Sequence, residues 1–321
     1  MLFRSLDDKA SFEIINKKQF SGIFQFNGPA LQSICNQIKV ETLEDIISVT
    51  SLARPGPMAS GGTNEWVKRK NGKAVEYPHA TFEPYLKTTM GMVAYQEQVM
   101  QICREIGDMS WEDVSTLRKA MSKSLGKEFF DQYGDKFKAG AKKRGMSGPM
   151  LDKIWDDLCA YGAMCFNRSH AVAYGIISYW CAYMKAHFPL EFAAATLTHE
   201  PDPAKQIKIL REMDEEGISY IPVDKDLSID KWTVGYKSGK KALLGPIQNV
   251  KGIGPKLVQQ IMSCRVRDEK LPKKAERLLE DAKTEIDSLW PIRDAFEVLM
   301  QDPRSEEHTS ELQSRFGISY A

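Results

Sequence analysis

The stretch that decides the fold is Ala160-Tyr-Gly-Ala-Met-Cys-Phe-Asn-Arg-Ser-His-Ala-Val-Ala-Tyr-Gly175, in which four polar side chains stand in a row from Asn167 to His170. An apolar, aromatic-rich run follows at once and continues to Met184. This order predicts a buried helix that opens on a polar cluster. The first turn of a helix carries free N–H groups and a positive dipole end, which favour anions. We therefore expect a phosphate contact here; the alternative is a plain Ser cap with a solvated Arg168 and a half-buried His170.

Composition sets broad limits on the class of protein. The chain has 321 residues, of which 42% are hydrophobic and 27% charged, as expected of a globular protein with two or three domains. Its six cysteines form no CxxC pair and no Cys/His cluster with zinc spacing. These features predict reduced core thiols, no metal site and a cytoplasmic location. No signal peptide or membrane-spanning apolar run is present, so no membrane partner is expected.

The two ends of the chain resemble translated sequencing-adapter DNA. The resemblance covers Leu2–Ser5 and, over a longer match, Arg304–Ser314, so we set aside roughly residues 1–5 and 304–321. We predict that both segments are artefacts and that the natural protein was cut at both ends. His308 is accordingly given no functional weight.

Helical periodicity dominates the remaining sequence. One helix is expected to begin near Pro29, and another follows a Thr42 cap and ends before the prolines at 55 and 57. Further helices are expected at 95–107, 110–121, 127–143, 148–159, 170–187, 190–198 and 204–216. Short strands are expected at 220–223, 232–236 and 242–244, and a last helix runs to residue 264. The predicted fold is mainly α (α+β), with a small β element near 220–245.

A basic segment lies between Arg118 and Arg144. It holds nine Lys or Arg residues against three Asp or Glu residues, a local net charge of +6, although the whole chain carries only +1. Within it, Arg118, Lys119 and Lys123 form a cationic cluster near one helix end. Such a cluster suits a triphosphate, because Arg grips oxygens in pairs while Lys acts as a point charge. The alternatives are a solvated helical face and cations that complement the helix dipole.

A second motif, Val250-Lys-Gly-Ile-Gly-Pro-Lys256, resembles the hairpin of a helix–hairpin–helix unit. Gly252 and Gly254 would let backbone N–H groups approach a DNA phosphate, and Ile253 would anchor the hairpin in the core. Lys251 and Lys256 would add charge without sequence specificity. The alternative is an ordinary turn before a helix.

Other catalytic motifs are missing from the sequence. There is no Walker A loop, no dinucleotide fingerprint and no Gly-x-Ser-x-Gly elbow. No convincing set of aspartates for two-metal catalysis is present, since the adjacent Asp156 and Asp157 would point about 100° apart on a helix. Glu97 has no apparent catalytic partner, so we interpret the polar cluster from Tyr95 to Gln98 as structural.

Several motifs in the same order resemble the alpha subunit of bacterial DNA polymerase III, the replicative family-C polymerase, in its cellular or phage-encoded forms. The resemblance runs from about Asp7 to Arg265 and is strongest in the fingers domain. Its motifs are Gly22-Ile-Phe-Gln-Phe26, Ala53-Arg-Pro-Gly-Pro57, Tyr95-Gln-Glu-Gln-Val-Met100, Leu117-Arg-Lys-Ala-Met121, Phe166-Asn-Arg-Ser-His170, Ala173-Tyr174 and Lys185-Ala-His-Phe-Pro189.

The resemblance implies roles for individual residues. Arg118 and Lys119 would hold the triphosphate of the incoming nucleotide, although Lys119 stands where a second Arg is more usual. Ser122 and Ser124 replace the family's more frequent Gly and Lys. The nucleotide-binding set would comprise Arg54, Gly56, Arg118, Lys119, Lys123, Asn167, Arg168, Ser169 and His170. The DNA-binding set would comprise Lys251, Gly252, Ile253, Gly254 and Lys256.

The resemblance also implies what the chain would lack and contact. The family's catalytic aspartates, which bind two Mg²⁺ ions, belong to a palm domain expected upstream, so no catalytic or metal-binding residue is assigned here. We expect a fingers domain at 6–225 and a β element with a helix–hairpin–helix region at 226–303. Together they would bind dNTP and template–primer DNA but would be inactive alone. The intact protein would also contact the sliding clamp and other replisome subunits.

Two other classes of protein stay open at this point. One is a non-catalytic helix–hairpin–helix DNA-binding module, in which the clusters at 118 and 167–170 are structural. The other is a helix–hairpin–helix repair enzyme such as a glycosylase. That enzyme needs a catalytic Asp or Lys shortly after the hairpin, and no persuasive candidate is present.

Overall fold

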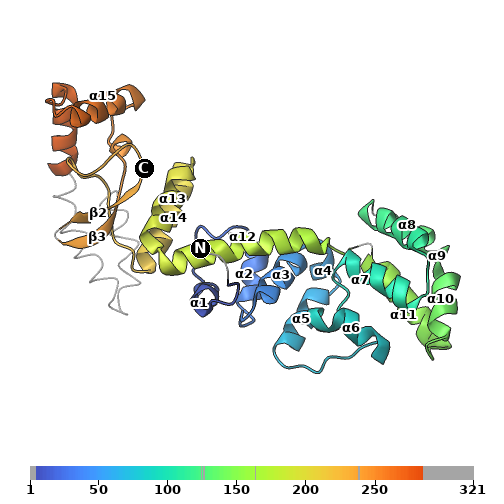
Figure 1. Ribbon diagram of the computed structural model, residues 1–321. Helices are drawn as coiled ribbons and strands as arrows, with labels where there is room; N and C mark the ends of the chain where they lie inside the picture. The colour runs from blue at the N-terminus through green and yellow to red at the C-terminus, as the bar shows by residue number, and fades with distance from the viewer. Residues whose placement is uncertain (1–4, 124, 126, 163, 238, 285–321) are drawn as a thin grey trace, which may run out of the picture. The chain divides into compact units, whose positions relative to one another are not determined.

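A computed structural model of the chain describes residues 5–123, 125, 127–162, 164–237 and 239–284. The described part is mainly helical with a small three-stranded sheet, so the predicted fold class is confirmed (Figure 1). The chain divides into two compact units, Met1–His187 and Phe188–Ala321. The domain boundaries predicted from the sequence stay predictions, and the adapter-like residues 304–321 lie outside the described residues.

The first unit is built from helices. They are α1 (Lys9–Asn16), α2 (Pro29–Cys35), α3 (Leu43–Leu52), α4 (Pro55–Ala59), α5 (Gly62–Lys70), η1 (Ala80–Phe82), α6 (Glu83–Leu86), η2 (Lys87–Thr89), α7 (Gln96–Gln101), the π-helical η3 (Ile102–Ile106), α8 (Trp111–Ser122), α9 (Lys127–Asp131), α10 (Gly134–Lys142), α11 (Pro149–Gly162) and α12 (Arg168–His187). The helices predicted at Pro29, after Thr42, near 95, after Ser110 and at 170–187 are all present.

The helix α12 packs along α1 and α3 (Figure 1). Its buried side includes the small residues Ala171, Gly175, Ser178 and Ala182, which recur every three or four positions. This spacing places them on one face of a helix. A Cβ added at Gly175 would lie 2.8 Å from Ile47 Cγ1, so the small side chain permits the close approach of α12 to α3.

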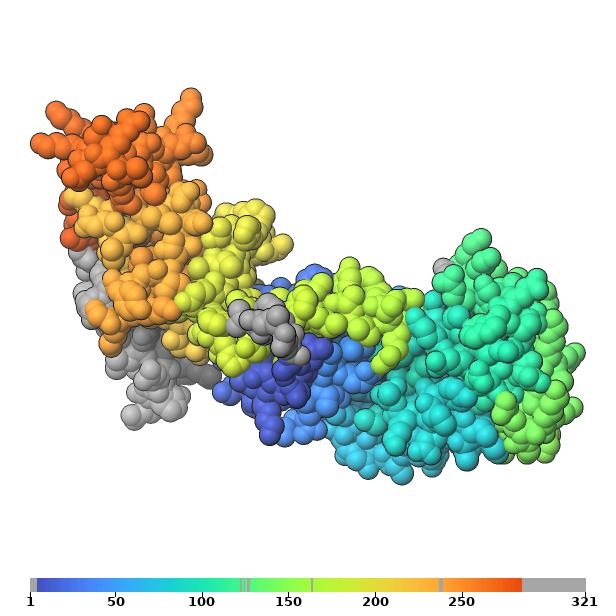
Figure 2. Space-filling view, in the orientation of Figure 1, coloured from blue at the N-terminus to red at the C-terminus, as the bar shows by residue number. Residues whose placement is uncertain are grey.

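The opposite side of α12 is partly open. Ile177 and Trp180 are exposed large apolar side chains on this helix. Part of α12 accordingly lies at the surface of the first unit in the space-filling view (Figure 2). The helix is therefore buried on one side only.

A second apolar core joins α7, η3, α8, α10 and α11. The sequence predicts one helix at 127–143, whereas the structure has two, α9 and α10. A Cβ at Gly134, where α10 begins, would lie 2.9 Å from Trp155 Nε1, and one at Gly140 would lie 2.0 Å from the Gly107 carbonyl oxygen. Close packing against Trp155 and Gly107 thus accompanies the break, and helical periodicity does not report such contacts.

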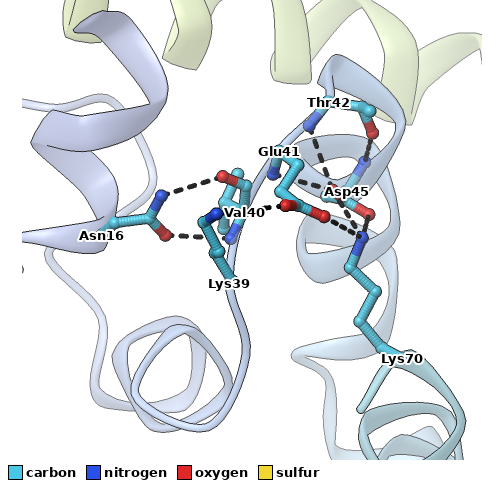
Figure 3. A network of polar contacts seen from close by, with 7 residues as sticks. All are labelled: Asn16, Lys39, Val40, Glu41, Thr42, Asp45 and Lys70. Atoms are coloured by element: carbon cyan, nitrogen blue, oxygen red, sulfur yellow. Dashed lines mark hydrogen bonds and ion pairs between the residues drawn. The ribbon is translucent and has the colours of Figure 1, made fainter. Parts of the chain in front are cut away.

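The N-terminus of α3 is held by a polar network (Figure 3). Thr42 Oγ1 accepts from the Asp45 N–H at 3.2 Å, and Asp45 Oδ2 accepts from the N–H groups of Glu41 and Thr42 at 2.9 and 3.0 Å. This is a reciprocal capping box. Lys70, at the end of α5, lies 2.8 Å from Asp45 Oδ1. Because Asp45 is only 5% exposed, Lys70 supplies the charge that compensates a buried carboxylate.

The same segment is tied to α1. The Asn16 side-chain amide donates to the Val40 carbonyl and accepts from the Val40 N–H, both at 2.9 Å (Figure 3). The short segment before α3 is therefore linked through polar contacts to α1, α3 and α5.

The second unit combines helices with the sheet. Its elements are α13 (Pro189–His199), α14 (Pro203–Glu215), β1 (Tyr220–Ile221), β2 (Thr233–Lys237), β3 (Lys240–Leu244), η4 (Ile247–Asn249), α15 (Pro255–Val266) and a further helix at 273–284. The strand order is β1-β3-β2, with β1 parallel and β2 antiparallel to β3. Trp232 and Leu243 pack with residues of α13 and α14, which gives the sheet its apolar cover.

Replacing Asp45 by Ala should destabilise the first unit by about 3–5 kcal/mol, because the largely buried Lys70 ammonium would lose its nearer carboxylate and two N–H groups would lose their acceptor. Denaturant-induced unfolding measures this change. The matched control is Glu41→Ala, which removes a carboxylate from the same network whose side chain is 55% exposed. The control should cost about 1 kcal/mol or less. Equal losses in the two variants would contradict the role given to Asp45.

Candidate functional site

Two segments far apart in sequence meet where α7 and α12 begin. The Phe166 N–H donates to the Ala94 carbonyl, and the Gln96 N–H donates to the Phe166 carbonyl, each at 2.9 Å. These bonds form an isolated parallel bridge between Tyr95 and Phe166. These bonds hold the stretch from Ala160 to Gly175 against the cluster from Tyr95 to Gln98. This agrees with a structural role for that cluster.

A groove of about 620 Å³ lies beside this bridge. Its lining residues are Arg54, Pro55, Gly56, Pro57, Gln96, Arg118, Met121, Met164, Cys165, Phe166 and Asn167. Four residues predicted to bind nucleotide, Arg54, Gly56, Arg118 and Asn167, are thus brought together. Among the described residues that line the groove, two are arginines and none is acidic.

Arg54 and Gly56 shape one wall of the groove. Arg54 is the N-cap residue of α4, and its guanidinium carbon lies 4.5 Å from the centroid of the Phe166 ring. This cation–π contact orients the cation against the bridge segment. A Cβ at Gly56 would lie 3.3 Å from Met164 Cγ and Sδ, so glycine lets the Met164 side chain come close.

Arg118 enters the groove from α8. Its side chain is exposed, as are those of Lys119 and Lys123. Within the described ranges, none of these three has an ion-pair or hydrogen-bond partner, although Lys119 and Lys123 do not line the groove.

Three other cations of the basic segment are already paired. Lys136 binds Asp113 at 2.9 Å, Lys138 binds Asp152 at 2.6 Å, and Lys143 binds Asp108 at 2.7 Å. The hydrogen bond from Lys136 holds the pKa of Asp113 below its usual value, so this pair is fully ionised at neutral pH. Unlike these three lysines, Arg118, Lys119 and Lys123 near the end of α8 keep a positive charge that a ligand could contact.

Asn167 caps α12. Its Oδ1 accepts from Ser169 Oγ at 2.5 Å and from the His170 N–H at 2.9 Å, while its carbonyl accepts from the Ala171 N–H at 3.1 Å. Ser169 therefore supports the cap but does not provide it. Since Asn167 also lines the groove, the start of α12 faces that space.

Arg168 and His170 lie outside the groove lining. The Arg168 guanidinium pairs with Glu44 Oε2 at 3.0 Å, and its backbone N–H donates to Glu97 Oε2 at 2.9 Å. The His170 ring lies between Phe166 and Tyr174, with centroids 5.3 and 4.0 Å away. Their predicted contact with nucleotide stays a prediction, and only Asn167 of the four polar residues borders the groove.

The groove is also lined by Phe166, Gln96, Met121, Met164 and Cys165, for which the sequence predicts no nucleotide-binding role. Phe166 stands next to the polar cluster, which was the one available signal. Burial raises the pKa of the Cys165 thiol, so it stays protonated and is a poor nucleophile at neutral pH. Across the described ranges, no three His, Cys, Asp or Glu side chains gather as a metal site.

The predicted DNA-binding hairpin lies in the second unit. Gly252 has a φ of +91°, which favours glycine, and Gly254 is the N-cap residue of α15. Ile253 is buried, whereas Lys251 and Lys256 are exposed. A single 3₁₀ turn, η4, precedes the hairpin, so the first helix is shorter than the motif suggests. No described helix is long and apolar enough to cross a bilayer.

Comparison with known proteins assigns the class of the chain. Residues 4–145 match the family described as the bacterial DNA polymerase III alpha subunit finger domain. This range contains Tyr95 of the bridge and both arginines of the groove. It makes this part of the chain a polymerase finger domain.

Similarity to individual proteins extends further along the chain. The DNA polymerase III subunit alpha of Aquifex aeolicus is 36% identical over 262 residues, which is 81% of this chain and 22% of that protein. The corresponding subunit of Campylobacter jejuni is 33% identical over 262 residues (81% and 22%), and that of Pseudomonas aeruginosa 34% over 270 residues (82% and 23%). The chain belongs to the DNA polymerase III alpha-subunit family and spans about a fifth of these curated relatives.

Replacing Asn167 by Ala should destabilise the first unit by about 1 kcal/mol, because two donors in the first turn of α12 lose their acceptor. Asn167→Asp should be neutral or slightly stabilising, since a carboxylate keeps the cap and suits the positive end of the dipole. Thermal unfolding of both variants measures the difference. Equal loss in the two variants would show that Asn167 does not act as a cap.

Proposed function

We propose that the groove binds the triphosphate of an incoming deoxynucleotide during template-directed DNA synthesis by the intact polymerase. The observation that carries this proposal is the meeting of Arg118 and Arg54 in a groove without a lining carboxylate. An unpaired guanidinium offers donors in a geometry that matches phosphate oxygens. The family membership supplies the reaction in which such a ligand takes part.

Each lining residue has a proposed task. Arg118 would hold the phosphates and stabilise the negative charge that develops on the leaving pyrophosphate. Arg54, stacked on Phe166, would add a second cation and shape the template path with Gly56. Asn167 would border the sugar and base while it caps α12. Lys119 and Lys123 would attract the anion from the exposed end of α8.

The reaction in this family implies Mg²⁺, which would neutralise phosphate charge when bound. The described residues of this chain do not fit such a site, because they provide no cluster of acidic ligands. Metal binding and catalysis would then belong to the palm domain of the intact protein.

The second unit would hold duplex DNA through the hairpin. Lys251 and Lys256 are exposed on either side of the buried Ile253, so they are free to contact phosphates. The intact protein would act in the cytoplasm with the sliding clamp and other replisome subunits. A DNA-binding module without a nucleotide site is the alternative that the following experiments separate.

Replacing Arg118 by Ala should weaken dNTP binding roughly tenfold, because a charge-assisted contact to phosphate is lost. Equilibrium titration of the 321-residue chain with a dNTP measures this affinity. The matched control is Arg144→Ala, which removes an exposed arginine of the same basic segment that does not line the groove. Equal affinities for the unaltered chain and Arg118→Ala would refute the groove as the triphosphate site.

Replacing Lys251 and Lys256 together by Ala should weaken binding to duplex DNA and lower its salt dependence by up to about two units of log–log slope. Titration of a template–primer at several salt concentrations gives both quantities. Lys205→Ala with Lys240→Ala is the control, since both lysines are exposed in the same unit. An unchanged slope would contradict the hairpin assignment.

The same template–primer, supplied with Mg²⁺ and dNTPs, should stay unextended by this chain alone, and extension of the primer would overturn that expectation.

A further inference from the structure

Arg168 is engaged on several sides by residues of α3 and α7. Its guanidinium lies 3.0 Å from Glu44 Oε2 in α3, and its backbone N–H donates to Glu97 Oε2 in α7 at 2.9 Å. The guanidinium carbon also lies 5.8 Å from the centroid of the Tyr95 ring. These contacts direct the side chain to the junction of three helices, whereas its neighbour Asn167 lines the groove.

The carboxylate of Glu44 depends on this contact. Its second oxygen, Oε1, is buried and accepts no hydrogen bond within the described part of the chain. Arg168 is the cation that pairs with Glu44 among the described residues. If the guanidinium turned toward a bound phosphate, Glu44 would keep a partly buried charge without compensation, which is unfavourable. The ion pair therefore opposes the use of Arg168 as a ligand.

The N–H contact to Glu97 acts on the same point of the chain. It adds a third bond two residues after Phe166, so the chain from 166 to 168 is held beside 94 to 97. Any force that fixes Arg168 also fixes Phe166 and Asn167, which precede it directly. Phe166 in turn carries the stacked guanidinium of Arg54.

We propose that Arg168 is a positioning residue and does not contact the nucleotide. With Glu44 and Glu97, it anchors the start of α12 so that Phe166, Asn167 and the stacked Arg54 keep their places in the groove. Glu44, which is 124 residues away in sequence, is then a determinant of nucleotide affinity. The inference rests on the proposed function of the groove and reverses the role that the sequence motif suggests for Arg168.

The decisive variant is Glu44→Gln, tested by titration of the full 321-residue chain with a dNTP. A neutral amide oxygen holds the guanidinium less strongly than a carboxylate, so a positioning role predicts a dissociation constant about three- to tenfold higher. If Arg168 is instead a phosphate ligand, Glu44 competes with the nucleotide for it. Removing that charge would then leave affinity unchanged or increase it, and this result overturns the proposal.

Glu41→Gln is the matched control, because it removes an exposed carboxylate just before α3 that pairs with Lys39 and Lys70 and not with α12. It should leave the dissociation constant unchanged. Thermal unfolding of both variants shows whether the fold is intact at the titration temperature. An equal loss of affinity in Glu41→Gln and Glu44→Gln would mean that only the change in net charge matters. That result would overturn the proposal.

A double-mutant cycle provides a second test that does not depend on a single variant. If Glu44 and Arg168 act as one unit, Arg168→Gln combined with Glu44→Gln should weaken dNTP binding no more than Arg168→Gln alone. Arg168→Lys keeps a cation opposite Glu44 and should recover most of the affinity. Additive losses, or no recovery with Lys, overturn the proposal.

Failure of the inference is distinguishable from failure of the proposed function. If the unaltered chain binds no dNTP, both are overturned. If it binds dNTP, and Arg118→Ala weakens that binding while Glu44→Gln does not, the groove stands and only the positioning role of Arg168 fails.

Discussion

The pairing of residues 94–97 with 166–168 is the constraint on which the site depends. Two backbone hydrogen bonds and one bond to a carboxylate join these segments, and the carboxylate bond spans 71 residues of sequence. Backbone groups in such partly buried places need partners, so the pairing also satisfies donors that the starts of α7 and α12 would otherwise leave open. The groove residues Gln96, Phe166 and Asn167 all belong to these two segments. Loss of the pairing would therefore separate the groove wall from the helices that support it.

The packing of α12 explains why this pairing is stable. A helix that begins at Arg168 can hold its first turn in place only if its later turns are fixed, and small residues such as Gly175 bring it close to Ile47 in α3. The same helix α3 carries Glu44 in its first turn and the buried Asp45 beside it. One side chain of α3 thus contacts the start of α12, while the next secures α3 itself through Lys70. Stability of the core and geometry of the site share these neighbouring residues.

Much of the fold follows from local signals in the sequence. The Thr42 cap, the Ser110 cap and the apolar run after His170 each predict a helix that the structure contains, because capping and periodicity are local properties. The break between α9 and α10 was not predictable in this way, since it accompanies the close approach of Gly134 to Trp155. The site shows the same division. Residue types identify Arg118 and Asn167 as candidates, but their meeting in one groove depends on tertiary packing.

The direction in which a cation points is the least predictable part of the site, and it has the largest electrostatic effect. The chain as a whole carries a net charge of only +1, and at physiological ionic strength exposed charges are screened beyond about 8 Å. A bound phosphate therefore responds to the few charges nearest to it. Lys136 is paired with Asp113 and Arg168 with Glu44, while Arg118 has no acidic partner among the described residues. The acids that bind other cations thus affect where the field stays positive, and Glu44 does so through its ion pair with Arg168.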